Sequence, residues 1–336
     1  MEEREVVVIT GASAGVGRAT ARAFGRRKAR IGLIARGRDG LEGARREIES
    51  VGGEAIVLPL DVSDPDAVEQ AASAVENAFG PIDIWINNAM LSVFSPIMEM
   101  QPDEYRRVTD VTYLGYVWGT LAALRRMKPR DRGAIVQVGS ALAYRGIPLQ
   151  SAYCAAKHAV QGFHDSLRSE LIHDNSKVRV VMVQMPALNT PQFRWVKSRL
   201  PRKAQPVPPI FQPEVAAEAI VWAAHSNRRE LNVGWPTTKA IVGNNFAPGY
   251  ADHYLAKHGY EAQMIDEPED PNRPDNLWGP LPGDRGAHGV FDDRALPKSV
   301  ELELNKNRGW IMAGAGALLL GAALGIRFAS ASRTSR

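Results

Sequence analysis

A tyrosine and a lysine four residues apart, Tyr153 and Lys157 in the stretch SAYCAAK, have the types and spacing for acid–base chemistry. If this stretch is helical, the two side chains lie one above the other on the same helix face. A free phenol titrates near pH ~10, and a neighbouring ammonium group favours the phenolate, which brings the pKa toward neutral pH. The same pair also occurs on helices that have no catalytic role, so the spacing alone leaves both interpretations open.

A glycine-rich loop, TGASAGVG, follows the first apolar run of the chain and precedes a helical pattern. Its glycines, Gly11, Gly15 and Gly17, allow a tight turn and a close approach to a pyrophosphate, which the unpaired N–H groups at the start of a helix then bind. At the end of the second apolar run, Ala35 and Arg36 stand where an acid would bind the ribose of NAD. Arg36 favours a 2′-phosphate, so we expect NADP, with NADPH preferred over NADH; the alternative for Arg36 is an ordinary exposed loop arginine.

The elements that must position these residues alternate between short apolar strands and longer helices. Strands that are apolar throughout are buried on both faces, which predicts a doubly wound parallel α/β sheet of the Rossmann type. The predicted strands are 5–10, 30–35, 54–60, 82–87, 134–139, 178–184 and 230–234, and the predicted covering helices include 64–79, 102–127 and 151–174. We expect one domain over residues 1–260, a linker rich in Pro, Gly and Asp over 261–300, and a C-terminal tail over 301–336.

Composition excludes several other classes of protein. The chain has 336 residues, of which 45% are hydrophobic, which is enough for a packed core. Its formal net charge of +4 is small, and its basic clusters fall where helices end, so we expect no nucleic-acid partner. A single cysteine, Cys154, excludes an internal disulfide and a cysteine-based zinc site, and we interpret it as a packing residue.

Taken together, the motifs resemble those of the short-chain dehydrogenase/reductase family over about residues 5–235. The resemblance rests on TGASAGVG, the DV pair at 61–62, NNA at 87–89, Ser140 and YCAAK at 153–157. It implies an NADP(H)-dependent oxidoreductase that interconverts a carbonyl and an alcohol. It also implies that the cofactor-binding positions are Gly11, Ser13, Gly15, Val16, Gly17, Arg36, Asp61, Val62, Asn88, Tyr153 and Lys157.

The same resemblance places the catalytic positions on Ser140, Tyr153 and Lys157. Tyr153 would act as the general acid/base, with Lys157 lowering its pKa and holding the nicotinamide ribose, and Ser140 would bind the substrate oxygen. Thr112 replaces the usual catalytic Asn of the family, which puts its proton relay in doubt.

Two further departures from the family pattern are Met90 after NNA and Ala187 after Pro186. They leave an alternative function open, a catalytically weak or inactive NADP-binding regulator or scaffold of the same fold.

Loops predicted to face the site are apolar, which favours a small apolar alcohol or ketone as substrate. Phe94, Tyr144, Phe193 and Trp195 are candidate walls, and the alternative is that these side chains pack against one another in the core.

Histidines do not indicate a metal site. No cluster of His, Cys and Asp has metal-ligand spacing, and we interpret His158, His164 and His173 as surface residues of one helix.

An uncharged run at residues 310–326 is a candidate transmembrane helix. As a helix, its seventeen residues would span about 25 Å, slightly less than a hydrocarbon core of about 30 Å. Its content of Ala and Gly keeps the alternative of a helix docked on a partner open. We expect a membrane-associated protein with a cytoplasmic catalytic domain, and basic residues in segment 192–205 either contact headgroups or form a solvated lid. The sequence leaves open whether the chain forms a homo-oligomer.

Overall fold

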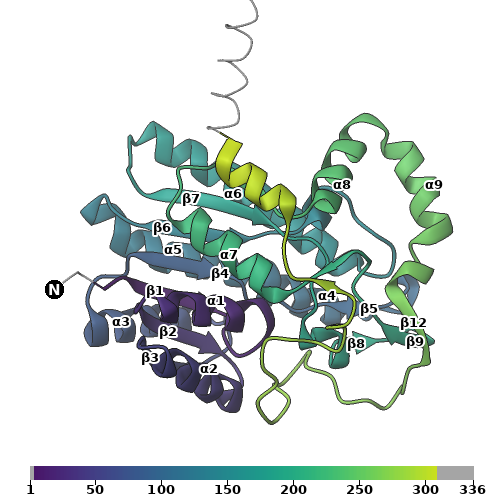
Figure 1. Ribbon diagram of the computed structural model, residues 1–336, viewed down its shortest axis with the longest axis horizontal. Helices are drawn as coiled ribbons and strands as arrows, with labels where there is room; N and C mark the ends of the chain where they lie inside the picture. Colours follow the sequence, from purple (N-terminus) through teal and green to yellow (C-terminus); the bar gives the residue numbers. More distant parts are fainter. Residues whose placement is uncertain (1–3, 309–336) are drawn as a thin grey trace, which may run out of the picture.

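The computed structural model describes residues 4–308. Its centre is a sheet of seven parallel strands in the order β11-β7-β6-β4-β1-β2-β3, which confirms the predicted Rossmann-type α/β fold (Figure 1). The strands are β1 (Val6–Thr10), β2 (Arg30–Ala35), β3 (Glu54–Pro59), β4 (Ile84–Asn87), β6 (Ala134–Val138), β7 (Arg179–Gln184) and β11 (Glu230–Asn232). All seven lie within a few residues of their predicted positions.

Helices cover both faces of the sheet because the strands have no polar face. One face packs against α1 (Gly15–Arg26), α2 (Arg38–Ser50) and α7 (Pro213–Ala224). The other packs against α3 (Pro65–Phe79), α5 (Gly115–Met127) and α6 (Ser151–His173). Along β1, Val7 and Ile9 enter the first core and Val6 and Val8 the second, as the two-residue period of a strand requires.

The predicted helix 102–127 is present, but it contains an irregularity. A short α-helix, α4 (Pro102–Thr109), passes through a π-helical segment at Asp110–Leu114 into α5. A π-helical turn inserts an extra residue into the helix and changes which side chains face the sheet, and such turns often occur at functional sites. Thr112 lies inside this segment.

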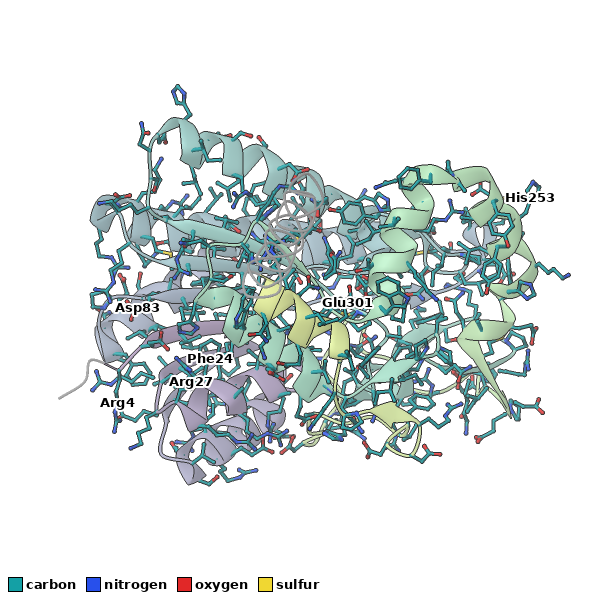
Figure 2. The ribbon with its side chains drawn as sticks, turned by 45° about the horizontal axis from the view of Figure 1, so that its top comes forward. Arg4, Phe24, Arg27, Asp83, His253 and Glu301 are labelled. Carbon is teal, nitrogen blue, oxygen red and sulfur yellow. The ribbon has the colours of Figure 1, made fainter. Side chains whose placement is uncertain are left out.

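The carboxyl ends of the strands all lie on one side of the molecule. Figure 2 shows Arg4, Arg27 and Asp83 at the opposite side, where β1, β2 and β4 begin, and His253 beyond the carboxyl side. The carboxyl side carries two helices, α8 (Trp235–Phe246) and α9 (Pro248–His258), which the sequence analysis did not identify. Short strand pairs complete it: β5 (Val93–Phe94) with β8 (Lys197–Ser198), β9 (Arg202–Ala204) with β12 (Met264–Pro268), and β10 (Ile210–Phe211) with β13 (Ala295–Leu296).

Residues 261–300 consist mainly of loops, as their composition indicates, and they run along the carboxyl side of the domain (Figure 1). A helix at 300–308 follows, and its Leu302 is buried in the core against α7. Across residues 4–308, no helix has the length and apolar character needed to cross a membrane. The candidate span at 310–326 lies outside the described residues.

Candidate functional site

A cavity of about 480 Å³ opens at the carboxyl ends of the strands. This is where parallel α/β sheets bind their ligands, and the volume is typical of a small-molecule site. The glycine loop lies at one side of the cavity, and Ser140, Tyr153 and Lys157 lie at another. The fold therefore brings the predicted cofactor loop and the predicted catalytic residues to one cavity.

The glycine loop is shaped by contacts that leave no room for side chains. Gly11 and Gly15 have φ angles of +69° and +55°, which only glycine adopts readily. A Cβ on Gly17 would lie 2.1 Å from the carbonyl oxygen of Gly11. No side chain caps the start of α1, so its first N–H groups are free of side-chain partners. Ser13 and Val16 complete the loop wall of the cavity.

Asn88 supports this loop from the neighbouring strand. Its side-chain amide donates to the carbonyl of Thr10 at 2.9 Å, and its backbone N–H donates to the Thr10 hydroxyl at 2.9 Å. The NNA turn thus fixes the end of β1, from which the glycine loop starts.

Lys157 is the most constrained of the predicted catalytic residues. Its side chain is 2% exposed, and Nζ donates to the hydroxyl of Tyr116 at 2.9 Å and to the carbonyl of Val138 at 2.7 Å. Nζ lies 5.7 Å from the centre of the Tyr153 ring. Burial lowers the pKa of Lys157 to about 7, because desolvation disfavours the ammonium.

Tyr153 is protonated at neutral pH in this environment. Burial raises its pKa above the ordinary value, and an interaction with the Ser140 hydroxyl opposes the rise only in part. Burial therefore outweighs the effect predicted for Lys157, whose ammonium donates to Tyr116 and Val138, so the pKa of Tyr153 is not brought toward neutral pH.

Ser140 is oriented by the turn that follows β6. Its Oγ accepts a hydrogen bond from the backbone N–H of Leu142 at 3.1 Å, so its own proton is left to donate into the cavity. The turn itself is a single 3₁₀ segment, Ala141–Ala143.

Tyr116 is a site residue that the sequence analysis missed. It is buried, accepts from Lys157 and donates to the carbonyl of Val138 at 3.0 Å. Burial raises the pKa of its phenol well above the ordinary value, so it is neutral. A signal was present, because Tyr116 is four residues after Thr112 in the predicted helix and four-residue spacing places two side chains on one face.

Thr112 takes no part in this network. Its hydroxyl donates to the carbonyl of Leu91 and accepts from the N–H of Leu91, both at 2.9 Å. The residue is fully buried, and both hydrogen bonds tie it to the loop that follows NNA. Thr112 therefore holds the cavity wall in place.

At the adenosine end of the expected dinucleotide site, the side chain of Arg36 is not free, as it would be in an exposed loop. Arg36 lines the cavity, but its guanidinium donates to the carbonyls of Asn276 and Leu277, the latter at 3.3 Å. The Asp61 carboxylate pairs with Arg107, which lowers the pKa of Asp61 against the opposing effect of burial. Val62 lines the same wall. Nothing in the spacing of residues 36 and 107 indicated that Leu277, which lies 241 residues after Arg36 and 170 after Arg107, would contact both.

The remaining wall is largely apolar, with two of the four predicted aromatic residues in it. Phe193 and Trp195 line the cavity. Phe94 is buried behind Phe193, with ring centres 6.2 Å apart, and so packs as the alternative interpretation expected. Tyr144 turns away and donates to the carboxylate of Glu230 at 2.8 Å.

From the sequence we interpret Cys154 as a packing residue and the three histidines of α6 as surface residues. Cys154 is buried and burial raises the pKa of its thiol, as expected of a packing residue. The interpretation of His164 as a surface residue is wrong, because it is fully buried on α6 and burial lowers its pKa to about 4. His158 and His173 are exposed.

Comparisons with known proteins identify the family of the chain. A family model described as short chain dehydrogenase matches residues 5–200. An uncharacterized oxidoreductase, YxnA, of Bacillus subtilis (strain 168) is 32% identical over 82% of this chain and 78% of its own length. Dehydrogenase/reductase SDR family member 7B of Bos taurus is 37% identical, but the match spans 52% of this chain and only 56% of that protein.

Solved structures include a metagenomic short-chain oxidoreductase in complex with NADP. It is 29% identical, has a TM-score of 0.57, and matches 68% of this chain and 96% of its own chain. The motifs, the seven-stranded sheet and the family match lead to one conclusion: the chain belongs to the short-chain dehydrogenase/reductase family of oxidoreductases.

Proposed function

We propose that this protein is an NADP(H)-dependent reductase that converts the carbonyl of a small apolar compound to an alcohol, with Tyr153 as the proton donor. The observation that carries the proposal is that Ser140, Tyr153 and Lys157 line the same cavity as the glycine loop. The NADP complex of the metagenomic relative supports the choice of cofactor.

The residues of the glycine loop fit a dinucleotide. The start of α1 has no side-chain cap, and the close contacts around Gly11 and Gly17 keep the loop backbone bare. The start of α1, whose N–H groups have no side-chain partner, and the positive end of its dipole then face the cavity, which suits a pyrophosphate. Asp61 and Val62 would hold the adenine, Arg36 the 2′-phosphate and Lys157 the nicotinamide ribose.

Bound NADPH supplies the hydride that reduces the carbonyl carbon. Tyr153 supplies the proton: its pKa is raised, so the phenol carries its proton at neutral pH and can pass it to the carbonyl oxygen as the carbon accepts the hydride. The alcohol is then complete, and the phenolate left on Tyr153 recovers a proton from solvent.

Lys157 and Ser140 assist at the two oxygens where negative charge develops. The Lys157 ammonium, held by Tyr116 and Val138, stabilises the phenolate of Tyr153 electrostatically. The Ser140 hydroxyl, oriented by the N–H of Leu142, would donate to the substrate oxygen.

The substrate end of the cavity supports an apolar substrate. Leu142, Ile147, Phe193, Trp195 and Val207 line it. A sugar or another polyol would leave hydroxyl groups without partners against these side chains, and each unpaired buried hydroxyl costs about 1–3 kcal/mol.

The test is a screen of apolar ketones and aldehydes in which oxidation of NADPH is followed by its absorbance. We expect turnover with the wild-type protein and none with Tyr153→Phe, while NADPH affinity is retained. Tyr250→Phe is the matched control, because Tyr250 is 74% exposed and does not line the cavity. Equal turnover in Tyr153→Phe would reject the mechanism, and NADPH binding without turnover on any compound would favour the regulator or scaffold.

We also propose that residues 310–326 anchor the protein to a membrane, with the catalytic domain on the cytoplasmic side where NADPH is available. The uncharged run itself supports this, with Arg327 at its end. Full-length protein should stay in the membrane pellet after an alkaline carbonate wash, and release by carbonate would reject the span.

We do not extend the membrane contact to segment 192–205, because three of its basic residues form ion pairs within the domain. Lys197 and Arg199 both pair with Glu104, at 3.1 and 2.8 Å. Lys203 pairs with Glu267 at 2.7 Å. Each of these three cations therefore has a carboxylate partner within the domain, although Lys197 and Arg199 share one.

A further inference from the structure

Residues 276–292, here called the strap, cross the carboxyl side of the domain beside the cavity. The strap belongs to the Pro-, Gly- and Asp-rich segment and has no role in the reaction described above. Its first residue, Asn276, donates its backbone N–H to the carbonyl of Trp195 at 3.0 Å. The strap therefore begins at the wall of the substrate end.

The strap next contacts the adenosine end of the cofactor site. The carbonyl of Leu277 accepts from Arg107 at 3.1 Å and from Arg36 at 3.3 Å, and the side chain of Leu277 is fully buried in the core. Both arginines are thus oriented by the strap. Pro280 and Leu281 extend the cavity wall from this point.

The middle of the strap is fixed to the glycine loop and the start of α2. Gly283 donates its N–H to Asp39 at 2.9 Å, and Asp284 pairs with Arg18 at 3.2 Å. Arg18 is 2% exposed and also pairs with Glu47 at 2.9 Å. The carbonyl of Gly286 accepts from the N–H of Gly15 at 3.1 Å, so the strap contacts the loop that faces a pyrophosphate.

The end of the strap reaches the loop that follows β7. Gly289 donates to the carbonyl of Asn189, and Phe291 donates to its side-chain oxygen, both at 3.1 Å. The Asn189 amide donates to Asp292 at 2.8 Å. Thr190, which follows Asn189, lines the cavity, so the end of the strap also lies beside the cavity wall.

Arg285 is the one strap side chain with a full positive charge at the cavity wall. It is exposed and donates to the carbonyl of Pro282 at 3.0 Å. Over residues 4–308, no carboxylate forms an ion pair with it. A guanidinium in this position, next to N–H groups at a helix start, suits a phosphate.

We propose that the strap is part of the cofactor site: it closes over the bound dinucleotide and directs Arg285 to its phosphates. This inference rests on the proposed function. The strap's contacts with Trp195, Arg36, Gly15 and Asn189 enclose the cleft along its length. A dinucleotide must part some of these contacts to enter or leave, so strap opening limits the rate of cofactor exchange.

The test measures NADPH association and dissociation rates by stopped-flow fluorescence on the full-length protein. Asp284→Ala releases the strap from Arg18 while Arg18 keeps Glu47, so we expect dissociation to accelerate about fivefold. Arg285→Gln should weaken NADPH affinity about threefold to tenfold, with a smaller dependence on salt concentration. Asp293→Ala and Lys298→Gln are matched controls, because they make the same charge changes just beyond the strap and outside the cavity lining.

The outcomes separate the strap from the reaction. Faster exchange in Asp284→Ala and weaker binding in Arg285→Gln, with unchanged controls, would support the proposal. If the wild type binds NADPH and both strap variants have the same rates and affinity as the wild type, the strap's role is overturned. The proposed function then remains intact. A wild-type protein that binds neither NADPH nor NADH would overturn the proposed function itself.

Discussion

Replacing Tyr116 by Phe removes one hydroxyl that faces Lys157 and changes little else in the core. The ammonium of Lys157 has two protein acceptors, the Tyr116 hydroxyl at 2.9 Å and the carbonyl of Val138 at 2.7 Å. In Tyr116→Phe only Val138 remains. The ring still fills its place in the core, so the fold should be retained.

The size of the effect follows from the charge on the lysine. A hydrogen bond from the charged ammonium contributes about 1.5–3 kcal/mol, and the same bond from the neutral amine contributes less. A difference of about 1.4 kcal/mol between the two forms shifts a pKa by about one unit. Loss of an acceptor disfavours the ammonium, so the pKa of Lys157 should fall below its value of about 7 by about one unit.

The assay is the pH dependence of kcat/KM, which reports groups of the free enzyme. The limb that follows Lys157 deprotonation should move about one unit toward acid in Tyr116→Phe, and activity above neutral pH should fall about tenfold. Thr112→Val is the matched control. It also deletes one buried hydroxyl from this helical stretch, but that hydroxyl bonds to Leu91 and not to Lys157. An unmoved profile in Tyr116→Phe, or an equal shift in Thr112→Val, would refute the reasoning.

Three further predictions follow from buried charge and close packing. Between about pH 7 and pH 10, the unfolded chain holds a proton on Lys157 that the folded protein lacks, so this residue makes stability rise with pH by at most about 1.4 kcal/mol per unit. Urea unfolding of Lys157→Met should lack this rise, and a parallel pH dependence in both proteins would contradict the buried-lysine assignment. NADPH should bind about tenfold to a hundredfold more tightly than NADH, and Arg36→Ala should reduce the ratio to near one by calorimetry; equal binding in the wild type would reject a role for Arg36. Gly17→Ala should abolish NADPH binding or folding, because its Cβ would meet the carbonyl oxygen of Gly11 at 2.1 Å, and tight binding would show that the loop can rearrange.

The sheet could be predicted because its strands are apolar throughout and are separated by glycine-rich or charged turns. Local patterns carry that information, and the TGASAGVG loop was recognisable for the same reason. The position of Lys157 near the cavity followed from its helix, but its hydrogen-bond partners did not. They depend on the packing of α5 against β6 and α6, which places Tyr116 beside Val138.

Side-chain directions in the loops were less predictable. Tyr144 turned to Glu230 and Phe94 packed behind Phe193 because tertiary neighbours, distant in sequence, offered a carboxylate in one case and a ring in the other. His164 is different: it lies four residues after Val160, which is buried on the same helix, and that spacing already indicated a buried position. The strap could not be placed, since loop composition says nothing about which surface a loop contacts.

The central claim is that hydride and proton reach the two ends of one carbonyl, and that Tyr153 supplies the proton. The most direct test follows a ketone accepted in the screen, using NADPH deuterated at the transferred position and mass spectrometry of the product. The account predicts an alcohol with one deuterium on the former carbonyl carbon from the wild type, and none above background from Tyr153→Phe, although that variant still binds NADPH. Product without deuterium, or equal deuterated product from Tyr153→Phe, would contradict it.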